Sequence, residues 1–309
     1  MGKYVVGRLG SAIVTLWIVI TVTFFLMHAI PGGPFTSEKR LPPEIIKNIE
    51  ARYHLRDPLI KQYSDYLFNI VKLDLGPSFK FQGRSVNDLI REGFPVSATL
   101  GVLAILVALA VGVPSGIFAA LGHNRWQDST LMLGAILGVS IPSFVMATLL
   151  QFIFSYILGW LPPALWGMPS QAVLPVLALS VFPMAFVARL TRSSMLEVLA
   201  QDYVRTARSK GLSEAMVIVR HVLKNALIPA IAVMGPLTAT LLTGTFVIEK
   251  IFAIPGLGRY YVNSIYNRDY TAILGVTVFY AAFVLLMSLL VDVIYAMIDP
   301  RIKLTGKGD

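Results

Sequence analysis

The sequence predicts an all-α membrane protein with six transmembrane helices. Of its 309 residues, 56% are apolar and 14% are charged, whereas a soluble domain carries about 45–50% and 25%. Its mean hydropathy of +0.71 is too high for all the apolar surface to lie inside a water-facing globule. Six stretches also have the apolar length that a helix needs to cross a bilayer, about 20 residues.

The six predicted spans cover residues 11–30, 98–121, 131–158, 172–188, 226–248 and 271–298. The first follows Lys3 and Arg8 and resembles a secretory signal. It is longer than the apolar region of such a signal, about 7–15 residues, and no small-x-small cleavage site follows it. We therefore expect an uncleaved anchor.

Positive charge indicates the orientation of the chain. Short loops on the cytoplasmic side of a membrane carry the excess of Lys and Arg. With the N-terminus inside, the two short outer loops contain only Lys250, Arg259 and Arg268. The inner segments then contain Lys3, Arg8, Arg125, Arg189, Arg192, Arg205, Arg208, Lys210, Arg220, Lys224, Arg301, Lys303 and Lys307. Both termini are predicted to be cytoplasmic, and the net charge of +9 indicates topology rather than nucleic-acid binding.

The spans carry almost no charge that could serve an ion relay. Within them the only Asp, Glu, Lys or Arg is Asp292, near the inner end of the last span. A carboxylate there suits a helix end at the interface, although intramembrane acids also mark coupling sites. Ion-driven transport is therefore disfavoured. Prolines that could kink the spans are Pro114, Pro142, Pro175, Pro183, Pro229 and Pro236.

A helical insertion is predicted on the outer side, in residues 31–97. Pro42, Pro43 and Glu44 have the composition of a helix start. After Pro58, apolar residues recur at helical spacing, namely Leu59, Ile60, Tyr63, Leu67, Ile70 and Val71. This segment could rest on the outer membrane face or meet an external partner.

The inner loop, residues 189–225, is predicted to contain an amphipathic helix. One face carries Leu196, Leu199, Ala200, Tyr203, Val204 and Ala207. Gly211 is expected to end this helix, and Ser213 and Glu214 suit the start of another. A basic amphipathic helix can lie on anionic lipid or dock into a protein groove, and the charge pattern alone favours neither.

Motifs in this loop resemble the permease subunits of binding-protein-dependent ABC importers. The general signature, Glu-Ala-Ala, three residues, Gly, nine residues and Ile-x-Leu-Pro, is matched only at Ala207, Gly211 and Leu223. The OppB/DppB-type dipeptide and oligopeptide permeases have a closer version, Asp202 to Leu212 followed by Arg220-His221 and Lys224 to Pro229. Further landmarks are Ile30-Pro31-Gly32-Gly33-Pro34, Leu73-Asp74-Leu75-Gly76-Pro77-Ser78, Ile254-Pro255-Gly256-Leu257-Gly258-Arg259, Asn267-Arg268-Asp269-Tyr270 and Asp299-Pro300-Arg301. At Gly33 the chain departs from the usual Pro-Gly-Asp-Pro.

The resemblance implies a type I ABC importer permease fold in a bacterial or archaeal cytoplasmic membrane. It implies a second, OppC/DppC-type permease, two ATPases of the OppD/OppF or DppD/DppF type, and an extracytoplasmic peptide-binding protein. ATP and Mg²⁺ would be bound by the ATPases, and this chain would bind no cofactor or metal and catalyse no reaction. The residues implied to couple it to the ATPases are Asp202, Tyr203, Arg205, Thr206, Ala207, Arg208, Lys210, Gly211, Leu212 and Glu214.

The sequence shows no site that could supply the energy for transport. It lacks Gly-x-x-x-x-Gly-Lys-Ser/Thr, the phosphate-binding loop of P-loop ATPases. Because an ion relay is also missing, the energy for transport must come from a partner. The expected organisation is residues 1–30 as inner end and first span, 31–97 as outer segment, 98–298 as five-helix core, and 299–309 as cytoplasmic tail.

Uncharged polar residues at membrane depth are candidates for lining a translocation path. They are Ser140, Ser143, Gln151, Ser180, Thr238, Thr243 and Thr245. Such groups could bind a peptide backbone without selecting side chains, although Ser and Thr in membrane helices often bond to their own or a neighbouring helix.

Other functions remain open at this stage. Relatives of this permease type carry nickel, haem or other small solutes, and a stand-alone channel would have similar spans. An intramembrane enzyme is disfavoured because the four histidines, His28, His54, His123 and His221, fall at span ends or in loops, and no His-Glu-x-x-His motif is present.

Overall fold

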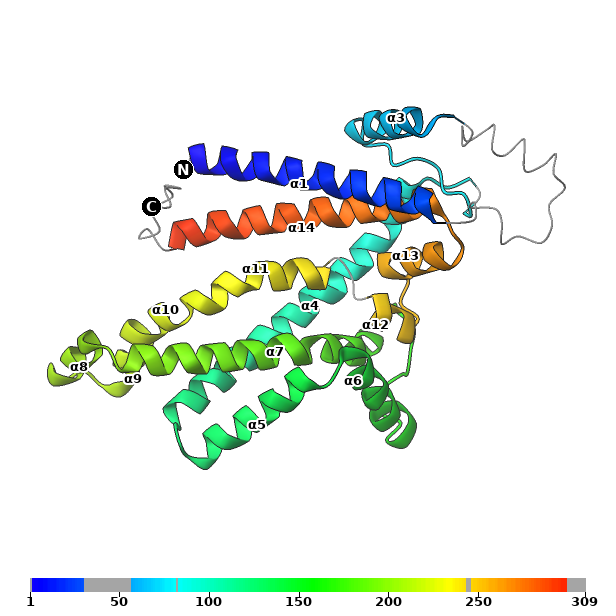
Figure 1. Cartoon of the computed structure of the whole chain (residues 1–309). Helices are drawn as coiled ribbons and strands as arrows, with labels where there is room; N and C mark the ends of the chain where they lie inside the picture. Colours follow the sequence, from blue (N-terminus) through cyan, green and yellow to red (C-terminus); the bar gives the residue numbers. More distant parts are fainter. Residues whose placement is uncertain (1, 31–56, 82, 243–245, 299–309) are drawn as a thin grey trace.

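Long apolar helices dominate the architecture. The computed structural model describes residues 2–30, 57–81, 83–242 and 246–298. Five stretches are long and apolar enough to cross a membrane. Four are the helices α1 (Gly2–Ala29), α4 (Val86–Leu121), α7 (Pro169–Leu199) and α14 (Tyr270–Ile298), and the fifth includes α11 (Ile228–Leu242) and α12 (Phe246–Ile251). Figure 1 shows α1 beside α14, with α4 crossing behind α7 and α11. Within the described ranges we find no β-strand, only an isolated bridge between Pro77 and Ser85.

The third predicted span, 131–158, is not one continuous helix. It is formed by α5 (Trp126–Ser140), α6 (Ser143–Leu150) and the π-helix η1 (Gln151–Ile157), with a bend of 106° between the two halves. The cause is Pro142, because the residue before a proline is pushed out of the helical region. Ile141 accordingly has an extended ψ of 121°. If the bent pair is one span, the chain has six.

The second and fourth spans are longer than predicted. α4 begins at Val86 rather than at 98, because Ser85 and Asp88 form a reciprocal capping box. The Ser85 side chain accepts the Asp88 N–H at 3.1 Å, and the Asp88 carboxylate accepts the Ser85 N–H at 2.9 Å. Residues 86–97, predicted as outer segment, therefore belong to a long helix.

The helices are interrupted at only some of the six prolines that could kink the spans. Pro114, Pro175, Pro183 and Pro236 lie inside continuous helices. Pro142 lies at the bend after α5, and Pro229 lies in the first turn of α11, just after α10 (Leu223–Ala226) ends. The side chain of Asp292, the one charge predicted within the spans, lies outside the described residues.

α4 and α7 form the central helix pair because small residues let their backbones approach closely. A Cβ atom added at Gly112 would lie 2.6 Å from the Met184 carbonyl oxygen, and one at Gly116 would lie 2.5 Å from the Ala188 carbonyl oxygen. Glycine is therefore required at these two contacts. Such small-residue seams are typical of helix packing in membranes.

The segment predicted as an outer insertion contains α3 (Leu59–Val71), as the apolar spacing predicts. The other predicted helix start, Pro42-Pro43-Glu44, lies outside the described residues. Tyr63 joins α3 to α1 through a 2.6 Å hydrogen bond between its hydroxyl and Thr21 Oγ1, and it packs against Phe24. The predicted apolar set does not form one buried face, because Ile60 and Val71 remain 78% and 82% exposed.

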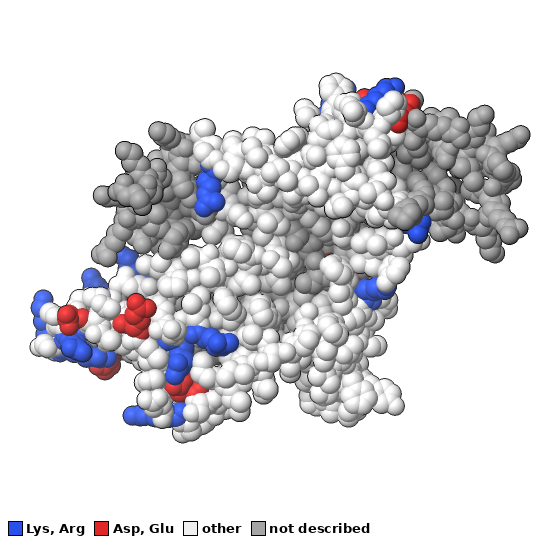
Figure 2. All heavy atoms as spheres, viewed as in Figure 1, with Lys and Arg blue, Asp and Glu red and all other residues white. Residues whose placement is uncertain are grey.

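Short helices connect the spans at both ends. At one end lie α8 (Asp202–Ser209), α9 (Glu214–Met216) and the π-helix η2 (Val217–Val222), and at the other lies α13 (Leu257–Tyr266). Figure 1 places α8 at the same end as the start of α1 and the end of α14. Figure 2 shows charged side chains gathered over this end, while the described surface between the two ends is almost entirely uncharged.

Candidate functional site

The candidate coupling helix is separated from the preceding span by a sharp turn. The sequence pattern treats Leu196 to Ala207 as one helix face, but α7 ends at Leu199 and α8 starts at Asp202. Gln201 between them has an extended ψ of 147°. As a result Ala200 and Tyr203, predicted on the apolar face, are exposed. Asp202 lies in the first turn of α8, where a carboxylate is favoured by the helix dipole.

The apolar face of α8 is buried in an apolar cluster of this same chain. Val204 is 0% exposed and Ala207 is 5% exposed. They pack with Ala120 at the end of α4, Met195 on α7, and residues of η2 and α10, and Leu212 packs against the edge of the cluster. Ala207 is therefore small to fit its own subunit, and it is not available to a partner.

The opposite face of α8, which points away from this chain, is polar and exposed. Asp202, Arg205, Thr206, Arg208 and Lys210 all lie on the surface. Arg205 is 3.8 Å from Asp202, and its side chain keeps 72% of its accessible surface. The Thr206 hydroxyl donates to the Asp202 carbonyl of its own helix at 3.0 Å. Arg205 and Lys210 are thus the cations of this face best placed to meet another molecule.

Arg208 instead closes the turn that follows α8. Its Nε and Nη2 donate to the two carboxylate oxygens of Glu214 at 2.7 and 3.2 Å. Gly211, between them, has a φ of +78°, a conformation that side chains with a Cβ rarely adopt. Gly211 thus ends α8 as predicted. Ser213 occupies the N-cap position of α9 but makes no side-chain capping bond.

A second tie holds α8 to the following helix. The side-chain amide of Asn225 on α10 donates to the Tyr203 hydroxyl at 2.8 Å. The sequence motif shares both residues, but their spacing of 22 positions gives no reason to pair them. Together with the Arg208–Glu214 ion pair, this contact holds α8 to the helices that follow it in the chain.

The hydrogen bonds found for the candidate path residues go to backbone carbonyls of this same chain. The hydroxyls of Ser140 and Ser180 donate to carbonyls of their own helices, Ile136 and Leu177, at 2.8 and 3.0 Å. Gln151 donates to the Pro163 carbonyl at 2.6 Å. Ser143 and Thr238 are half-buried, and Thr243 and Thr245 lie outside the described residues. Their role in a path stays a prediction.

A buried acid that the sequence analysis missed lies on α12. Glu249 is 0% exposed, one position beyond the predicted end of the fifth span. Its carboxylate accepts the Ser97 hydroxyl at 2.7 Å and the Arg259 N–H at 3.2 Å. Ser97 in turn accepts the Leu257 N–H at 2.9 Å. A Cβ at Gly256 or Gly258 would collide with this carboxylate, which explains both glycines of the Pro-Gly-Leu-Gly motif.

A second missed acid, Asp269, joins two other motifs of the sequence. Its carboxylate accepts the Ser78 hydroxyl and the N–H groups of Phe79 and Ala272, at 3.1 and 3.2 Å for the latter two. Asp269 is 0% exposed and precedes the first residue of α14. The Leu73–Ser78 and Asn267–Tyr270 landmarks therefore build one buried joint at the end of the molecule opposite α8.

The acids that the structure describes do not assemble into a metal site. In residues 2–30, 57–81, 83–242 and 246–298 there is no group of three or more His, Asp and Glu side chains that could hold a metal ion. Both buried carboxylates are surrounded by hydrogen-bond donors from serine and the backbone. These bonds give both carboxylates a structural role.

Comparison with known proteins bears on the whole chain. Residues 112–304 match the family described as "Binding-protein-dependent transport system inner membrane component", and residues 1–101 match the N-terminal family of the same components. The chain is 52% identical over 308 residues to the dipeptide transport system permease protein DppB of Bacillus subtilis, with 100% of both chains covered. It is 48% identical over 305 residues to the oligopeptide transport system permease protein OppB of Escherichia coli K12, covering 98% of this chain and 100% of that one.

Solved structures agree at the level of the fold. A chain of the MetNI methionine ABC transporter, in an inward-facing conformation, matches with a TM-score of 0.58 at 16% identity, covering 68% of this chain and 96% of that one. An amino acid ABC transporter matches with a TM-score of 0.52 at 20% identity, covering 68% and 94%. On these grounds the chain belongs to the inner membrane components of binding-protein-dependent transport systems.

Proposed function

We propose that this chain is one of two permease subunits of an ATP-driven importer of dipeptides or oligopeptides. It would form half of the translocation pathway in a bacterial or archaeal cytoplasmic membrane, and a second homologous permease would form the other half. Support for peptide as cargo comes from the full-length similarity to the dipeptide and oligopeptide permeases. Nickel, haem or another small solute is the alternative cargo.

The remaining partners follow from the family. Two cytoplasmic ATPases would bind ATP and Mg²⁺, and an extracytoplasmic binding protein would deliver the peptide. Both termini would then be cytoplasmic, on the same side as α8. This orientation is supported by the position of α8 at the end of the molecule where α1 begins and α14 ends.

The observation that carries the proposal is the two-faced character of α8. Its apolar face, Val204 and Ala207, is buried in this subunit, and its polar face, Arg205 and Lys210, is exposed. A helix that is anchored on one side and charged on the other can be pushed by a partner without detaching. Exposed charges of this kind set register and docking rate more than affinity.

The test is charge reversal on the exposed face in the reconstituted transporter. We expect the double variant Arg205→Glu/Lys210→Glu to lower peptide uptake per ATP hydrolysed at least tenfold, while the subunit still inserts into the membrane. Arg125→Glu also reverses a charge, at one exposed position in the α4–α5 turn, and should leave coupling intact. Uptake by the double variant equal to that of Arg125→Glu would remove the coupling assignment.

The cargo needs its own measurement. In proteoliposomes that contain the full transporter, labelled dipeptides and oligopeptides should compete with one another for uptake, and Ni²⁺ or haem should not. Current through the purified chain in the absence of an ATPase would favour a channel instead.

A further inference from the structure

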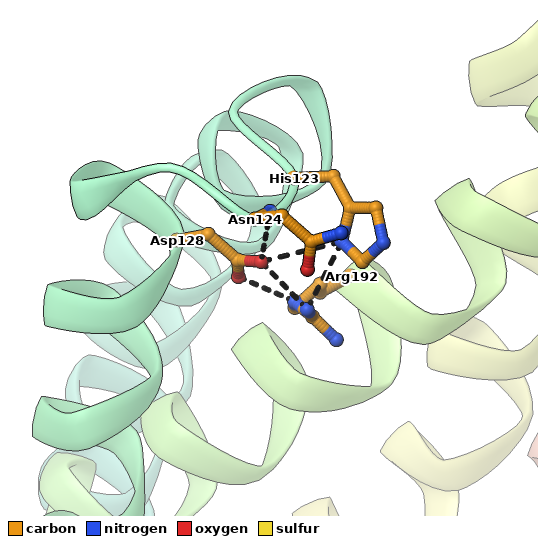
Figure 3. A network of polar contacts seen from close by, with 4 residues as sticks. All are labelled: His123, Asn124, Asp128 and Arg192. Atoms are coloured by element: carbon orange, nitrogen blue, oxygen red, sulfur yellow. Dashed lines mark hydrogen bonds and ion pairs between the residues drawn. The ribbon is translucent and has the colours of Figure 1, made fainter.

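A buried ion pair ties the α4–α5 turn to α7 near the cytoplasmic end. Figure 3 shows Asp128, in the first turn of α5, pointing at Arg192 of α7. Nε of Arg192 donates to Oδ1 of Asp128 at 2.5 Å, and Nη2 donates to Oδ2 at 2.7 Å. The N–H of Asn124 also donates to Oδ2, at 3.1 Å. Two parallel bonds fix both the distance and the angle between the two elements.

His123 completes the network but is not its main support. Its Nδ1 lies 3.3 Å from Asp128 Oδ2 and 3.3 Å from Arg192 Nη2. One ring nitrogen cannot donate to the carboxylate and accept from the guanidinium at the same time, so it serves one of them. The shorter contacts, between Arg192 and Asp128, decide the geometry.

Burial distinguishes this pair from the exposed ion pairs of the same end. The side chain of Asp128 retains 6% of its accessible surface and that of Arg192 25%. In Arg208–Glu214 the corresponding fractions are 41% and 63%. Arg208 and Glu214 are also only six positions apart, whereas Asp128 and Arg192 are 64 positions apart and belong to different elements. The buried pair can therefore transmit force between helices.

The position of the pair relates it to α8. Arg192 lies about two turns before the end of α7, which leads through a short turn into α8. Ala120, at the end of α4, packs in the same cluster as Met195, Val204 and Ala207. The α4–α5 turn is thus joined to the α7–α8 element twice, by apolar packing and by the ion pair.

We propose that Asp128 and Arg192 are positioning residues that make the α4–α5 turn and the α7–α8 element move as one piece. Displacement of α8 by an ATPase would then carry the start of α5 with it. The far end of α5 is the bend at Ile141 and Pro142, where helical geometry is already interrupted. Motion would be absorbed there, because hinges lie at element ends that tolerate changes in φ and ψ. This inference rests on the proposed role of α8.

The first test removes the pair and leaves α8 unchanged. In the reconstituted transporter, Asp128→Asn and Arg192→Gln should each lower uptake per ATP hydrolysed by fivefold or more, and the ATPases should still co-purify at the wild-type ratio. Arg192→Lys keeps one ion-pair bond and should lose less than Arg192→Gln. Arg125→Gln and Arg189→Gln remove exposed arginines from the same turn and the same helix, and they should transport normally.

The second test restores the tie by another bond. Because the chain has no cysteine, the double variant Asp128→Cys/Arg192→Cys can be joined specifically with a short thiol-bridging reagent such as dibromobimane. We expect the unlinked variant to be uncoupled and the linked variant to regain at least half of the wild-type ratio of uptake to ATP hydrolysis. Formation of the link is measured by bimane fluorescence.

The outcomes separate this inference from the function on which it depends. Normal coupling in Asp128→Asn and Arg192→Gln, in transporters where Arg205→Glu/Lys210→Glu is uncoupled, would overturn the inference and leave the function standing. A link that forms without restoring coupling would overturn it as well. If reversal of the α8 charges has no effect, the proposed function fails first.

Discussion

Buried acids at the end of the molecule opposite α8 show what individual residues contribute to this fold. Glu249 and Ser97 are 152 positions apart, and Asp269 and Ser78 are 191 positions apart. No local pattern could pair them, so the motifs are visible in the sequence but the contacts between them are not. Gly211 was predictable, because a glycine that ends a helix is a local signal.

We predict that Glu249→Gln destabilises the subunit by about 1–3 kcal/mol, the cost of leaving buried donors without a proper acceptor. The amide group keeps the shape of the carboxylate but turns an NH₂ group towards the Ser97 hydroxyl or the Arg259 N–H. The thermal unfolding midpoint of the purified subunit in detergent measures this. Glu197→Gln is the matched control, because Glu197 is exposed at the end of α7. Equal midpoints for the two variants would show that the Glu249 network adds nothing to stability.

At the scale of elements, apolar length was a good guide to where helices lie and a poor guide to where they end. The second and fourth predicted spans are in the right place but too short. The capping box at Ser85 and the polar turns of α7 lie outside the apolar stretches from which the spans were predicted. In the third span Pro142 breaks the helix, while Pro114 and Pro183 do not break theirs. A proline alone therefore does not predict where a helix is interrupted.

At the contact between α4 and α7, a Gly→Ala substitution has opposite effects on helix propensity and on helix packing. In an unpacked helix, Gly→Ala is favourable by about 1 kcal/mol. At Gly116 the new methyl group would lie 2.5 Å from the Ala188 carbonyl oxygen and 2.7 Å from the Thr191 Cβ. Neither atom is the end of a flexible side chain, so the helices must move apart, at a cost of about 1–3 kcal/mol.

Gly116→Ala should therefore lower the unfolding midpoint, and Gly134→Ala should raise it or leave it unchanged. Gly134 lies on α5, and a Cβ added there meets nothing within 4 Å. A Gly116→Ala variant as stable as Gly134→Ala would mean that the seam is looser than its geometry indicates.

Different interactions hold the two ends of the molecule together. At the end opposite α8, Glu249 and Asp269 fix loops to helix starts through buried hydrogen bonds. At the other end, α8 exposes charge and is held by apolar packing and ion pairs. Sequence periodicity could predict α8 and its charged face. The network that carries it could not be predicted, because Asp128 and Arg192 meet only in the folded chain.

Orientation in the membrane is the property of the whole chain that a single labelling experiment decides. We expect Arg125→Cys to be protected from a membrane-impermeant maleimide in right-side-out vesicles and Arg259→Cys to be labelled. Both arginines are exposed, one in the α4–α5 turn and one at the start of α13, and the chain has no other cysteine to react. The physical reason is the excess of Lys and Arg in the loops on the side of α8, which favours a cytoplasmic location. Permeabilised vesicles should label both variants equally, which controls for reactivity. Labelling of Arg125→Cys alone in sealed vesicles would place α8 outside the cell, out of reach of any cytoplasmic ATPase.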